Sequence, residues 1–574
     1  MGKQLRTLAP YLLRYRRQLA AGMAALALKD ATAALGPLVI RRTIDTLTAG
    51  LTLRLVWESG LLLLGLALLK GFFQYWMRWI LIGVSREIEY DLRNDLFAHL
   101  TRLTPRFYGT HRTGDIMSRA TNDLNAVRMM IGPGIMYWTD TVCIFAAAIA
   151  VMVSFDWRLT FFVLLPMPAV SFSVGYFGRA IHDRFQRIQA MFSDISSRVQ
   201  ENLAGVRIVR AYAQEESERR QFRELNQKYI EENLKLTRIW GSFYPLLEVL
   251  IGLTFVIVLW MGGRQVIRGV ISLGSFVMFI SYMGMLIWPM IALGWVVNLM
   301  QRGTASLERI NQLLHEQPEI DDRAAQAAGE ICGEIEFCGV GVSYALDGID
   351  LKIPAGQTLA IVGPTGSGKT TLINLVARLR DPDRGQVRID GVDVKQIPLA
   401  KLLSSIGLVP QETFLFSETV SENIAFGAGE AGEEPIRRAA EAAGITGDIE
   451  EFPQRYETLV GERGITLSGG QKQRTALARA LIRDPKILIL DDALSSVDTM
   501  TEERILQSLS AIMRGRTTLL ISHRVSTVRS AHRIVVLAGG RLVEQGTHDE
   551  LIAHGGYYAA LYEKQLLEEE LEKQ

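Results

Sequence analysis

Six apolar segments before residue 301 constrain this chain more than any other feature. Each approaches or exceeds the roughly 20 residues that an α-helix needs to cross a bilayer. The fourth and sixth segments carry no charged residue, whereas Lys29 and Asp30 interrupt the first. The sequence therefore predicts a six-helix transmembrane domain. Its segments are Leu19–Ile40, Leu61–Gly83, Ile131–Ser154, Leu159–Phe177, Tyr244–Gly262 and Val270–Met300.

The spacing of these segments predicts helices that extend beyond the bilayer. Only a few residues join the third segment to the fourth and the fifth to the sixth, but 47 residues separate the second from the third and 66 separate the fourth from the fifth. Within these long intervals, Ser85–Leu103 and Ile181–Thr237 keep helical apolar spacing with mixed charge. Helix pairs of this length reach about 30 Å beyond the membrane. We expect them to turn back near Tyr108–Arg119 and Ala211–Phe222.

Basic residues near the N-terminus indicate how the chain is oriented in the membrane, and the net charge limits the partners that it can bind. The basic stretch Tyr11–Arg17 (YLLRYRR) places the N-terminus in the cytosol, and no cleavable signal sequence is visible. The layout favours a bacterial plasma membrane, with both termini cytoplasmic and membrane lipids as surroundings. The 62 basic and 61 acidic side chains leave a net charge of +1. This balance excludes a whole-chain nucleic-acid binder, because no basic excess exists to neutralise phosphates.

The second half has an α/β pattern. Runs such as Thr358–Val362 and Ile487–Leu490 are short and continuously apolar, as buried parallel strands are, and helical stretches alternate with them. The acidic, alanine-rich stretch before this half is typical of a linker. We therefore predict a transmembrane domain over 1–315, a linker over 316–330 and an α/β domain over 331–574, which the following motifs identify as a nucleotide-binding domain.

The strongest motif is a phosphate-binding loop, GPTGSGKT, directly after the predicted strand TLAIV. Its glycines let backbone N–H groups approach the phosphates of ATP, Lys369 neutralises the β- and γ-phosphates, and the Thr370 hydroxyl can bind Mg²⁺. A helix that begins here directs its positive end at the anion. The predicted phosphate-binding residues are Gly363, Pro364, Thr365, Gly366, Ser367, Gly368, Lys369, Thr370 and Thr371.

A second motif places an acid at the end of a buried strand. Asp491 follows the apolar run Ile487–Leu490, which is the expected Walker B position and holds Mg²⁺ through water. Asp491 alone would be a weak signal, but a P-loop lies upstream. We therefore expect Thr370 and Asp491 to hold Mg²⁺.

A third motif, LSGGQ at Leu467–Gln471, is the signature of the ATP-binding-cassette (ABC) family. The chain resembles a bacterial ABC exporter half-transporter of the multidrug or lipid type over nearly its whole length. This resemblance implies a six-helix transmembrane domain with long cytosolic helix extensions, fused to an α/β P-loop nucleotide-binding domain. The motifs follow in the family's order: Tyr344 in the A-loop, the P-loop, Gln411 in the Q-loop, VGERG (Val460–Gly464) in the X-loop, LSGGQ, SSVD ending at Asp498 in the D-loop, and His523 in the H-loop.

The resemblance implies roles for these residues. Tyr344 would stack on adenine, Gln411 would reach Mg²⁺ and the cytosolic turns, and His523 would hydrogen-bond the γ-phosphate. The signature residues open a helix and so form a second anion site, which in this family closes on the γ-phosphate of the other subunit. A dimer is therefore implied. The signature residues in question are Ser468, Gly469, Gly470 and Gln471.

One position departs from the family pattern. Fast ATPases of this family carry Glu directly after the Walker B Asp, whereas this chain has Asp492, whose carboxylate is one methylene shorter. A retraction of about 1.5 Å slows catalysis, because displacements near 1 Å can cost about 10²-fold in rate. This resembles the degenerate-site half of heterodimeric multidrug exporters, whose partner carries the Glu. The alternatives are a homodimeric drug pump or lipid flippase, and a membrane-anchored nucleotide-gated regulatory subunit.

The expected activity is ATP-driven export of amphiphilic drugs or lipids by alternating access, with Asp492, His523 and Gln411 as candidate catalytic residues. The substrate class is implied by the resemblance alone. Asp140 and Glu248 lie within membrane segments, where charges are costly and face a cavity or a partner. They could favour cationic amphiphiles, or they could serve in pairing between helices.

Overall fold

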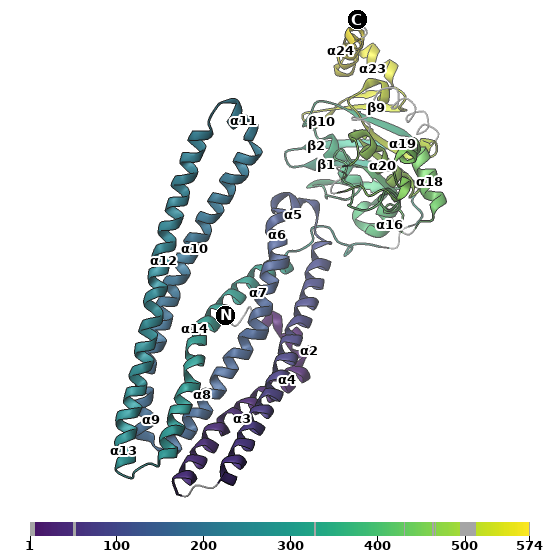
Figure 1. The fold of residues 1–574 in the computed structure, drawn as a ribbon. Helices are drawn as coiled ribbons and strands as arrows, with labels where there is room; N and C mark the ends of the chain where they lie inside the picture. The colour runs from purple at the N-terminus through teal and green to yellow at the C-terminus, as the bar shows by residue number, and fades with distance from the viewer. Residues whose placement is uncertain are drawn as a thin grey trace. The chain divides into compact units, whose positions relative to one another are not determined.

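The computed structural model describes residues 6–49, 53–326, 329–429, 431–461, 464, 466–493 and 512–572 (Figure 1). The chain divides into two compact units. The first comprises Met1–Thr101 and His111–Glu316, and the second comprises Arg102–Thr110 and Gln317–Gln574. The short segment Arg102–Thr110 therefore belongs to the C-terminal unit, although it lies between two helices of the first.

The first unit is helical. Six stretches among the described residues are long and apolar enough to cross a membrane, which confirms the six-helix prediction. Its elements are η1 (Arg6–Leu8), α2 (Ala9–Arg14), α3 (Arg16–Ala49), α4 (Leu53–Leu100), α6 (Thr113–Ser118), η2 (Arg119–Asp123), α7 (Leu124–Met129), η3 (Met130–Gly134), α8 (Ile135–Phe155), α9 (Trp157–Leu164), α10 (Met167–Ala204), α11 (Val206–Ala211), α12 (Glu215–Ile257), η4 (Val258–Gly262), α13 (Gly263–Ile267) and α14 (Leu273–His315).

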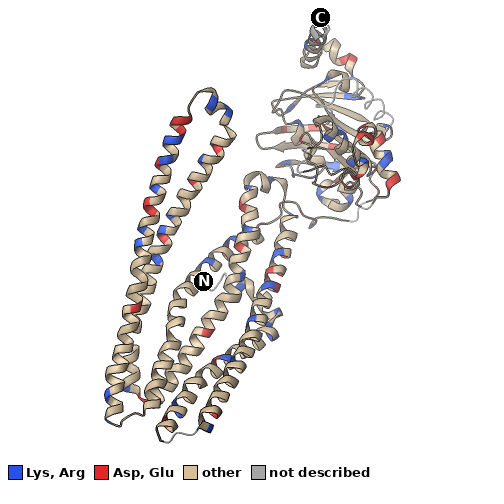
Figure 2. Ribbon diagram, viewed as in Figure 1, with Lys and Arg blue, Asp and Glu red and all other residues tan. Residues whose placement is uncertain are grey.

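Several helices continue well past their apolar windows, as the spacing predicted. Helices α10 and α12 have 38 and 43 residues and lie side by side. Charged side chains gather on this pair toward α11 and become sparse toward α13 (Figure 2). A helix that is apolar at one end and charged at the other fits a bilayer at the first and water at the second.

The two turns lie earlier in the chain than we expected. The first occupies residues 101–112, and Thr113–Ser118 is already helix α6. The second occupies residues 205–214, and α12 begins at Glu215. Glycine at position 205 ends α10, because glycine is a weak helix former. Three glutamates in the first turn of α12 favour a helix start by complementing the helix dipole.

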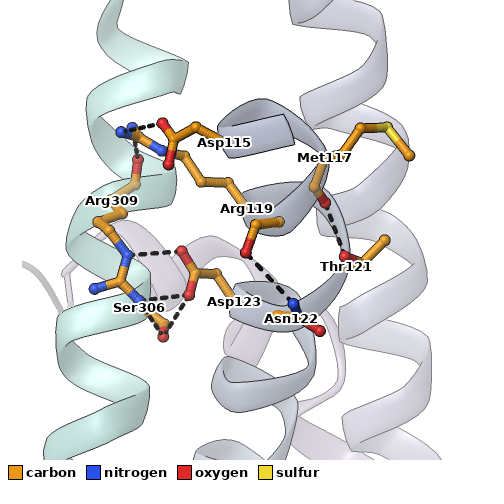
Figure 3. Close-up of polar contacts among 9 residues, drawn as sticks. Asp115, Met117, Arg119, Thr121, Asn122, Asp123, Ser306 and Arg309 are labelled. Carbon is orange, nitrogen blue, oxygen red and sulfur yellow. Dashed lines mark hydrogen bonds and ion pairs between the residues drawn. The ribbon is translucent and has the colours of Figure 1, made fainter. Parts of the chain in front are cut away.

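An ionic network joins η2 to α14 (Figure 3). The buried Asp123 carboxylate accepts hydrogen bonds from Ser306 Oγ at 2.9 Å and from both Nε and a terminal nitrogen of Arg309, the former at 2.8 Å. Arg119 donates to the carbonyl of Arg309 at 3.2 Å and pairs with Asp115 at 2.8 Å. Segments 183 or more residues apart are thereby bonded through charge-assisted contacts.

The second unit is α/β, as predicted. Its main sheet has the order β10-β9-β3-β8-β7-β6, parallel except for β10, and a smaller antiparallel sheet has the order β2-β1-β4-β5. The strands are β1 (Ile335–Val342), β2 (Leu346–Ile353), β3 (Thr358–Val362), β4 (Arg384–Ile389), β5 (Val392–Asp393), β6 (Ile406–Val409), β7 (Ile487–Asp491), β8 (Thr517–Ile521), β9 (Arg533–Ala538) and β10 (Arg541–Gly546).

Helices cover these sheets, and β3, β7 and β8 are buried along their whole length. Complete burial explains why these strands are continuously apolar instead of alternating. The helices of the unit are α5 (Pro105–Thr110), α15 (Lys369–Val376), η5 (Val394–Gln396), α16 (Leu399–Ser404), α17 (Val420–Ala425), α18 (Glu433–Ala442), α19 (Thr446–Glu451), η6 (Arg455–Glu457), α20 (Gly469–Leu481), α22 (Val525–Val528), α23 (His548–His554) and α24 (Tyr557–Glu572).

The expected linker is bonded to this unit along its described part. Arg378 donates to the carbonyl of Asp321 at 2.9 Å, and the N–H of Gln326 donates to the carbonyl of Gln396 at 2.7 Å. In addition, Arg106 of α5 lies 3.2 Å from Glu319. Backbone groups and one carboxylate of this stretch therefore attach it to the unit, which composition alone did not indicate.

Candidate functional site

The P-loop connects β3 to α15 in a conformation that requires glycine. Gly363 has φ +151°, and a Cβ there would lie 2.0 Å from the carbonyl oxygen of Leu537. Gly368 has φ +101°, and a Cβ there would lie 2.5 Å from the carbonyl oxygen of Ala345. L-residues avoid these dihedral angles, and backbone atoms cannot move aside cheaply. The loop is therefore packed so closely that side chains are excluded at both glycines.

Lys369 and Ser367 give this loop the chemistry of an anion site. Lys369 Nζ donates to the carbonyls of Gly363 and Pro364, both at 2.9 Å. Burial lowers the pKa of Lys369, and the carboxylates of Asp491 and Asp492 oppose that shift. The buried Ser367 Oγ has no hydrogen-bond partner among the residues that the structure describes. An ammonium group and a hydroxyl with an unused donor are both groups that can bind a phosphate oxygen.

Thr370 and Asp491 meet at the first turn of α15. Thr370 Oγ1 donates to Asp491 Oδ2 at 2.9 Å, and Asp491 is 3% exposed at the end of β7. Burial raises the pKa of Asp491 and the Asp492 carboxylate raises it further, while the hydrogen bond from Thr370 and the charge of Lys369 lower it. Two hard oxygen atoms in contact, one of them on a carboxylate, match what Mg²⁺ prefers.

A cavity of about 230 Å³ brings the predicted residues together. The P-loop follows β3, Gln411 follows β6, Asp491 and Asp492 end or follow β7, and His523 follows β8. Because β3, β8, β7 and β6 are parallel neighbours, their carboxyl ends meet at one edge of the sheet, where α/β sheets bind ligands. The lining residues are Ala345, Thr365, Gly366, Gly368, Lys369, Thr370, Thr371, Gln411, Asp491, Asp492, Ile521 and His523.

The remaining predicted residues, among them Gly363, Pro364 and Ser367 of the P-loop, do not line this cavity. Tyr344 is fully exposed with φ +67°, next in sequence to the lining residue Ala345. Ser468 caps α20: its Oγ accepts from the N–H of Gln471 at 3.3 Å, and its N–H donates to Gln471 Oε1 at 2.9 Å. Gly469 and Gly470 form the first turn of α20. The signature motif is thus a helix N-terminus, as predicted, and does not line the cavity of its own chain.

Two further motifs cannot be placed in full. Glu462 and Arg463 of the predicted X-loop, and the D-loop that ends at Asp498, lie outside the described residues. Just before the latter, Asp492 has φ +49°, and its N–H donates to the carbonyl of Ile521 at 2.9 Å. Aspartate tolerates this left-handed conformation better than most residues. The backbone of Asp492 is therefore held against β8.

Sequence reasoning missed a buried hydrogen-bond network that holds the segment after Gln411. Asn423 in α17 accepts from the N–H of Phe416 at 2.9 Å and donates to its carbonyl at 3.0 Å. Arg479 of α20 donates to the Asn423 side chain at 2.7 Å, to its carbonyl at 2.8 Å, and to the carbonyl of Phe414 at 2.8 Å. Burial lowers the pKa of Arg479. No local pattern distinguishes Asn423 from a surface asparagine, since its partners lie up to 56 residues away.

Fold and site together define a P-loop ATPase joined to a multi-pass membrane domain. Residues 19–290 match the model of the ABC transporter transmembrane region, and residues 346–495 match that of the ABC transporter ATP-binding domain. The chain belongs to the ABC transporter family and is an ATPase coupled to transport.

Curated relatives match over most of their length. The chain is 40% identical over 501 residues to the probable multidrug resistance ABC transporter ATP-binding/permease protein YheI of Bacillus subtilis, covering 86% of this chain and 85% of the relative. It is 36% identical over 509 residues to the ATP-dependent lipid A-core flippase of Syntrophus aciditrophicus, covering 88% and 85%. A solved bacterial Atm1-family ABC exporter with ATP bound is 28% identical with a TM-score of 0.79, covering 96% of this chain and 98% of that one.

Proposed function

We propose that this chain is one half of a heterodimeric exporter that moves amphiphilic small molecules, drugs or lipids, across a bacterial plasma membrane. Relatives named for multidrug resistance and for lipid flipping support the substrate class. Asp492 supports the heterodimer, because it stands in the cavity where the family's fast ATPases carry Glu. Both termini and the charged ends of α10 and α12 would then lie in the cytoplasm.

We assign the cavity to the triphosphate of ATP. Lys369 and the P-loop glycines would bind the phosphates, Tyr344 would stack on adenine, and His523 would hydrogen-bond the γ-phosphate. Thr370, Asp491 and Gln411 would hold Mg²⁺, which supplies charge neutralisation on the phosphates when bound. The place of Lys369 in the cavity lining and the contact of Thr370 with Asp491 support this assignment.

The signature helix argues for a second subunit. Ser468, Gly469 and Gly470 present an exposed or half-exposed helix N-terminus that does not line the cavity of the same chain. A helix N-terminus attracts anions, and Gln471 completes its capping box. We assign these residues to the γ-phosphate bound by a partner that carries Glu after its Walker B Asp. Catalysis would then occur chiefly in that composite site.

ATP binding would close the two nucleotide-binding domains, and the turns at residues 101–112 and 205–214 would transmit closure to the membrane helices. A homodimeric lipid flippase is the second candidate, and the likeness to the lipid A-core flippase favours it. A nucleotide-gated regulatory subunit is a third possibility, of a different class. It predicts nucleotide binding without transport of any substrate.

The test is Mg²⁺-dependent ATP hydrolysis by the full chain purified alone in lipid, with Lys369→Ala as the blank. We expect turnover at the blank level. The chain is then purified from its native membranes, and the stoichiometric partner that copurifies is identified and coexpressed with it. In this complex, Ser468→Arg in the present chain should abolish turnover, since it blocks the composite site, whereas Asp492→Asn should leave most of it.

Three results contradict parts of this proposal. Turnover of the isolated chain on the order of 1 s⁻¹ or more, an ordinary enzymatic rate, establishes Asp492 as competent and a homodimer as the working unit. Copurification of this chain with itself alone supports the same conclusion. A complex that hydrolyses ATP but moves neither drugs nor lipids in vesicles supports the regulatory subunit.

A further inference from the structure

Three charged side chains meet between two membrane-spanning helices. Lys29 and Asp30 lie on α3, and Asp140 lies on α8, all within segments apolar enough to cross a bilayer. Lys29 Nζ is 2.7 Å from Asp30 Oδ1 and also donates a hydrogen bond to Asp140 Oδ1. The pairing between helices that we considered for Asp140 is therefore present, whereas Glu248 is exposed on α12.

This triad is not balanced in charge. It holds two carboxylates against one ammonium group, and among the described residues no ion pair joins Asp30 or Asp140 to a second cation. The Asp30 side chain is 3% exposed, and beyond the ion pair with Lys29 neither of its oxygens has a hydrogen-bond partner in the described part of the chain. With all three groups ionised, one negative charge remains without compensation.

An uncompensated charge is energetically unfavourable within a membrane-spanning segment. Ionised side chains in a membrane segment are paired or face a cavity, because the apolar surroundings do not solvate them. A cation brought to the triad would remove the imbalance. Asp140 is the member of the triad that such a cation would contact, because its side chain is 26% exposed, compared with 10% for Lys29.

An aromatic pair lies on the same face of α8 as Asp140. Tyr137 precedes Asp140 by three residues on α8, which places both on one face of the helix. Its ring makes an edge-to-face contact with Trp295 of α14 at 5.5 Å between centroids. Aromatic faces attract cations and accommodate apolar groups. The surroundings of Asp140 on this face are therefore suited to the apolar body of an amphiphile.

We propose that the Lys29–Asp30–Asp140 triad binds the positively charged head group of an amphiphilic substrate, and that the chain therefore prefers cationic over neutral amphiphiles. Asp140 contacts the cation directly. Asp30 contributes its buried negative charge and holds Lys29, so that Lys29 does not neutralise Asp140 completely. This inference rests on the proposed export function and names its substrate class.

The experiment measures binding, independently of ATP turnover. The full chain in lipid nanodiscs is titrated with a fluorescent quaternary-ammonium amphiphile and with its neutral isostere, in which carbon replaces the charged nitrogen. The wild-type protein should bind the cation about tenfold or more tightly than the isostere. Asp140→Asn should abolish this ratio with little change for the isostere. The exposed carboxylate on α12 supplies a matched control, and Glu248→Gln should preserve the ratio.

A double variant separates charge from structure. Lys29→Gln combined with Asp30→Asn removes one charge of each sign, so the net charge of the site and the preference for the cation should persist. If Asp140→Asn weakens both ligands equally, or if the wild-type protein binds both alike because a proton neutralises the triad, the inference is wrong. Loss of ATP-dependent movement of both probes with the binding ratio intact instead contradicts the proposed export function.

Discussion

Asp492→Glu is the substitution that most directly tests whether the chain's own ATP site is slow. The backbone at this position is fixed by its left-handed φ of +49° and by the hydrogen bond to the carbonyl of Ile521. The residue lines the same cavity as Lys369 and Asp491. Because the Cα atom cannot approach the phosphates, only the length of the side chain decides how far the carboxylate reaches.

The expected magnitude follows from this geometry. One additional carbon–carbon bond advances the carboxylate by about 1.5 Å, and a displacement near 1 Å at a reacting group changes a rate by about 10²-fold. At about 1.4 kcal/mol per factor of ten, this corresponds to about 2.7 kcal/mol of activation free energy. Asp492→Glu should therefore raise the turnover of the isolated chain by about 10²-fold.

The assay is steady-state phosphate release by the purified chain in lipid, at a concentration that allows two copies to associate through their intact signature motifs. Nucleotide binding is measured in parallel, so that a gain in turnover is not mistaken for a gain in affinity. Lys369→Ala in the Asp492→Glu background should return turnover to the blank. Unchanged turnover with nucleotide bound normally would falsify the argument from carboxylate reach.

Three further predictions follow from packing and hydrogen bonds. Gly368→Ala should weaken ATP binding by tenfold or more, because the new Cβ meets a backbone carbonyl at 2.5 Å in addition to the strain of φ +101°. At Gly366, where φ is +81° but a Cβ meets no atom within 4 Å, Gly366→Ala adds only backbone strain of about 1–2 kcal/mol and should weaken binding less, as measured by titration with a fluorescent nucleotide. Asp123→Asn should destabilise the helical unit by about 1–3 kcal/mol, seen as a lower melting temperature, and the half-exposed Asp115→Asn should not. Asn423→Ala should also destabilise its unit by about 1–3 kcal/mol and increase hydrogen exchange after Gln411; equal exchange in wild type and variant would contradict the bracing role.

The sequence predicted best those elements whose local pattern is set by burial. Strand Thr358–Val362 was placed with its observed bounds, and the run Ile487–Leu490 was one residue short, because Asp491 still pairs with Ile521 in the sheet. Asp491 was expected directly after the strand, and its carboxylate does face the cavity. Continuous apolar runs and strict motif spacing carry this information without reference to distant residues.

Contacts between segments that lie far apart in the sequence were harder to predict. Lys29 and Asp140 are 111 residues apart, and helical periodicity does not indicate which faces of two helices meet. The second turn was expected too late in the chain, because α12 already begins at Glu215 and a single glycine at 205 carries the signal for the break. Asn423 and Arg479 are recognisable only after α17 and α20 are packed together.

The placement of Arg102–Thr110 in the C-terminal unit has a consequence for how this gene could be divided. The polypeptide passes from one unit to the other three times, around residues 101, 110 and 316. An ATPase fragment beginning at residue 317 would lack α5, with its buried Phe107 and the partner of Glu319. A split into separate membrane and ATPase genes would thus turn an intramolecular attachment into a bimolecular one that depends on concentration. Continuous synthesis as one polypeptide guarantees a ratio of one membrane unit to one ATPase unit and keeps α5 beside its binding surface.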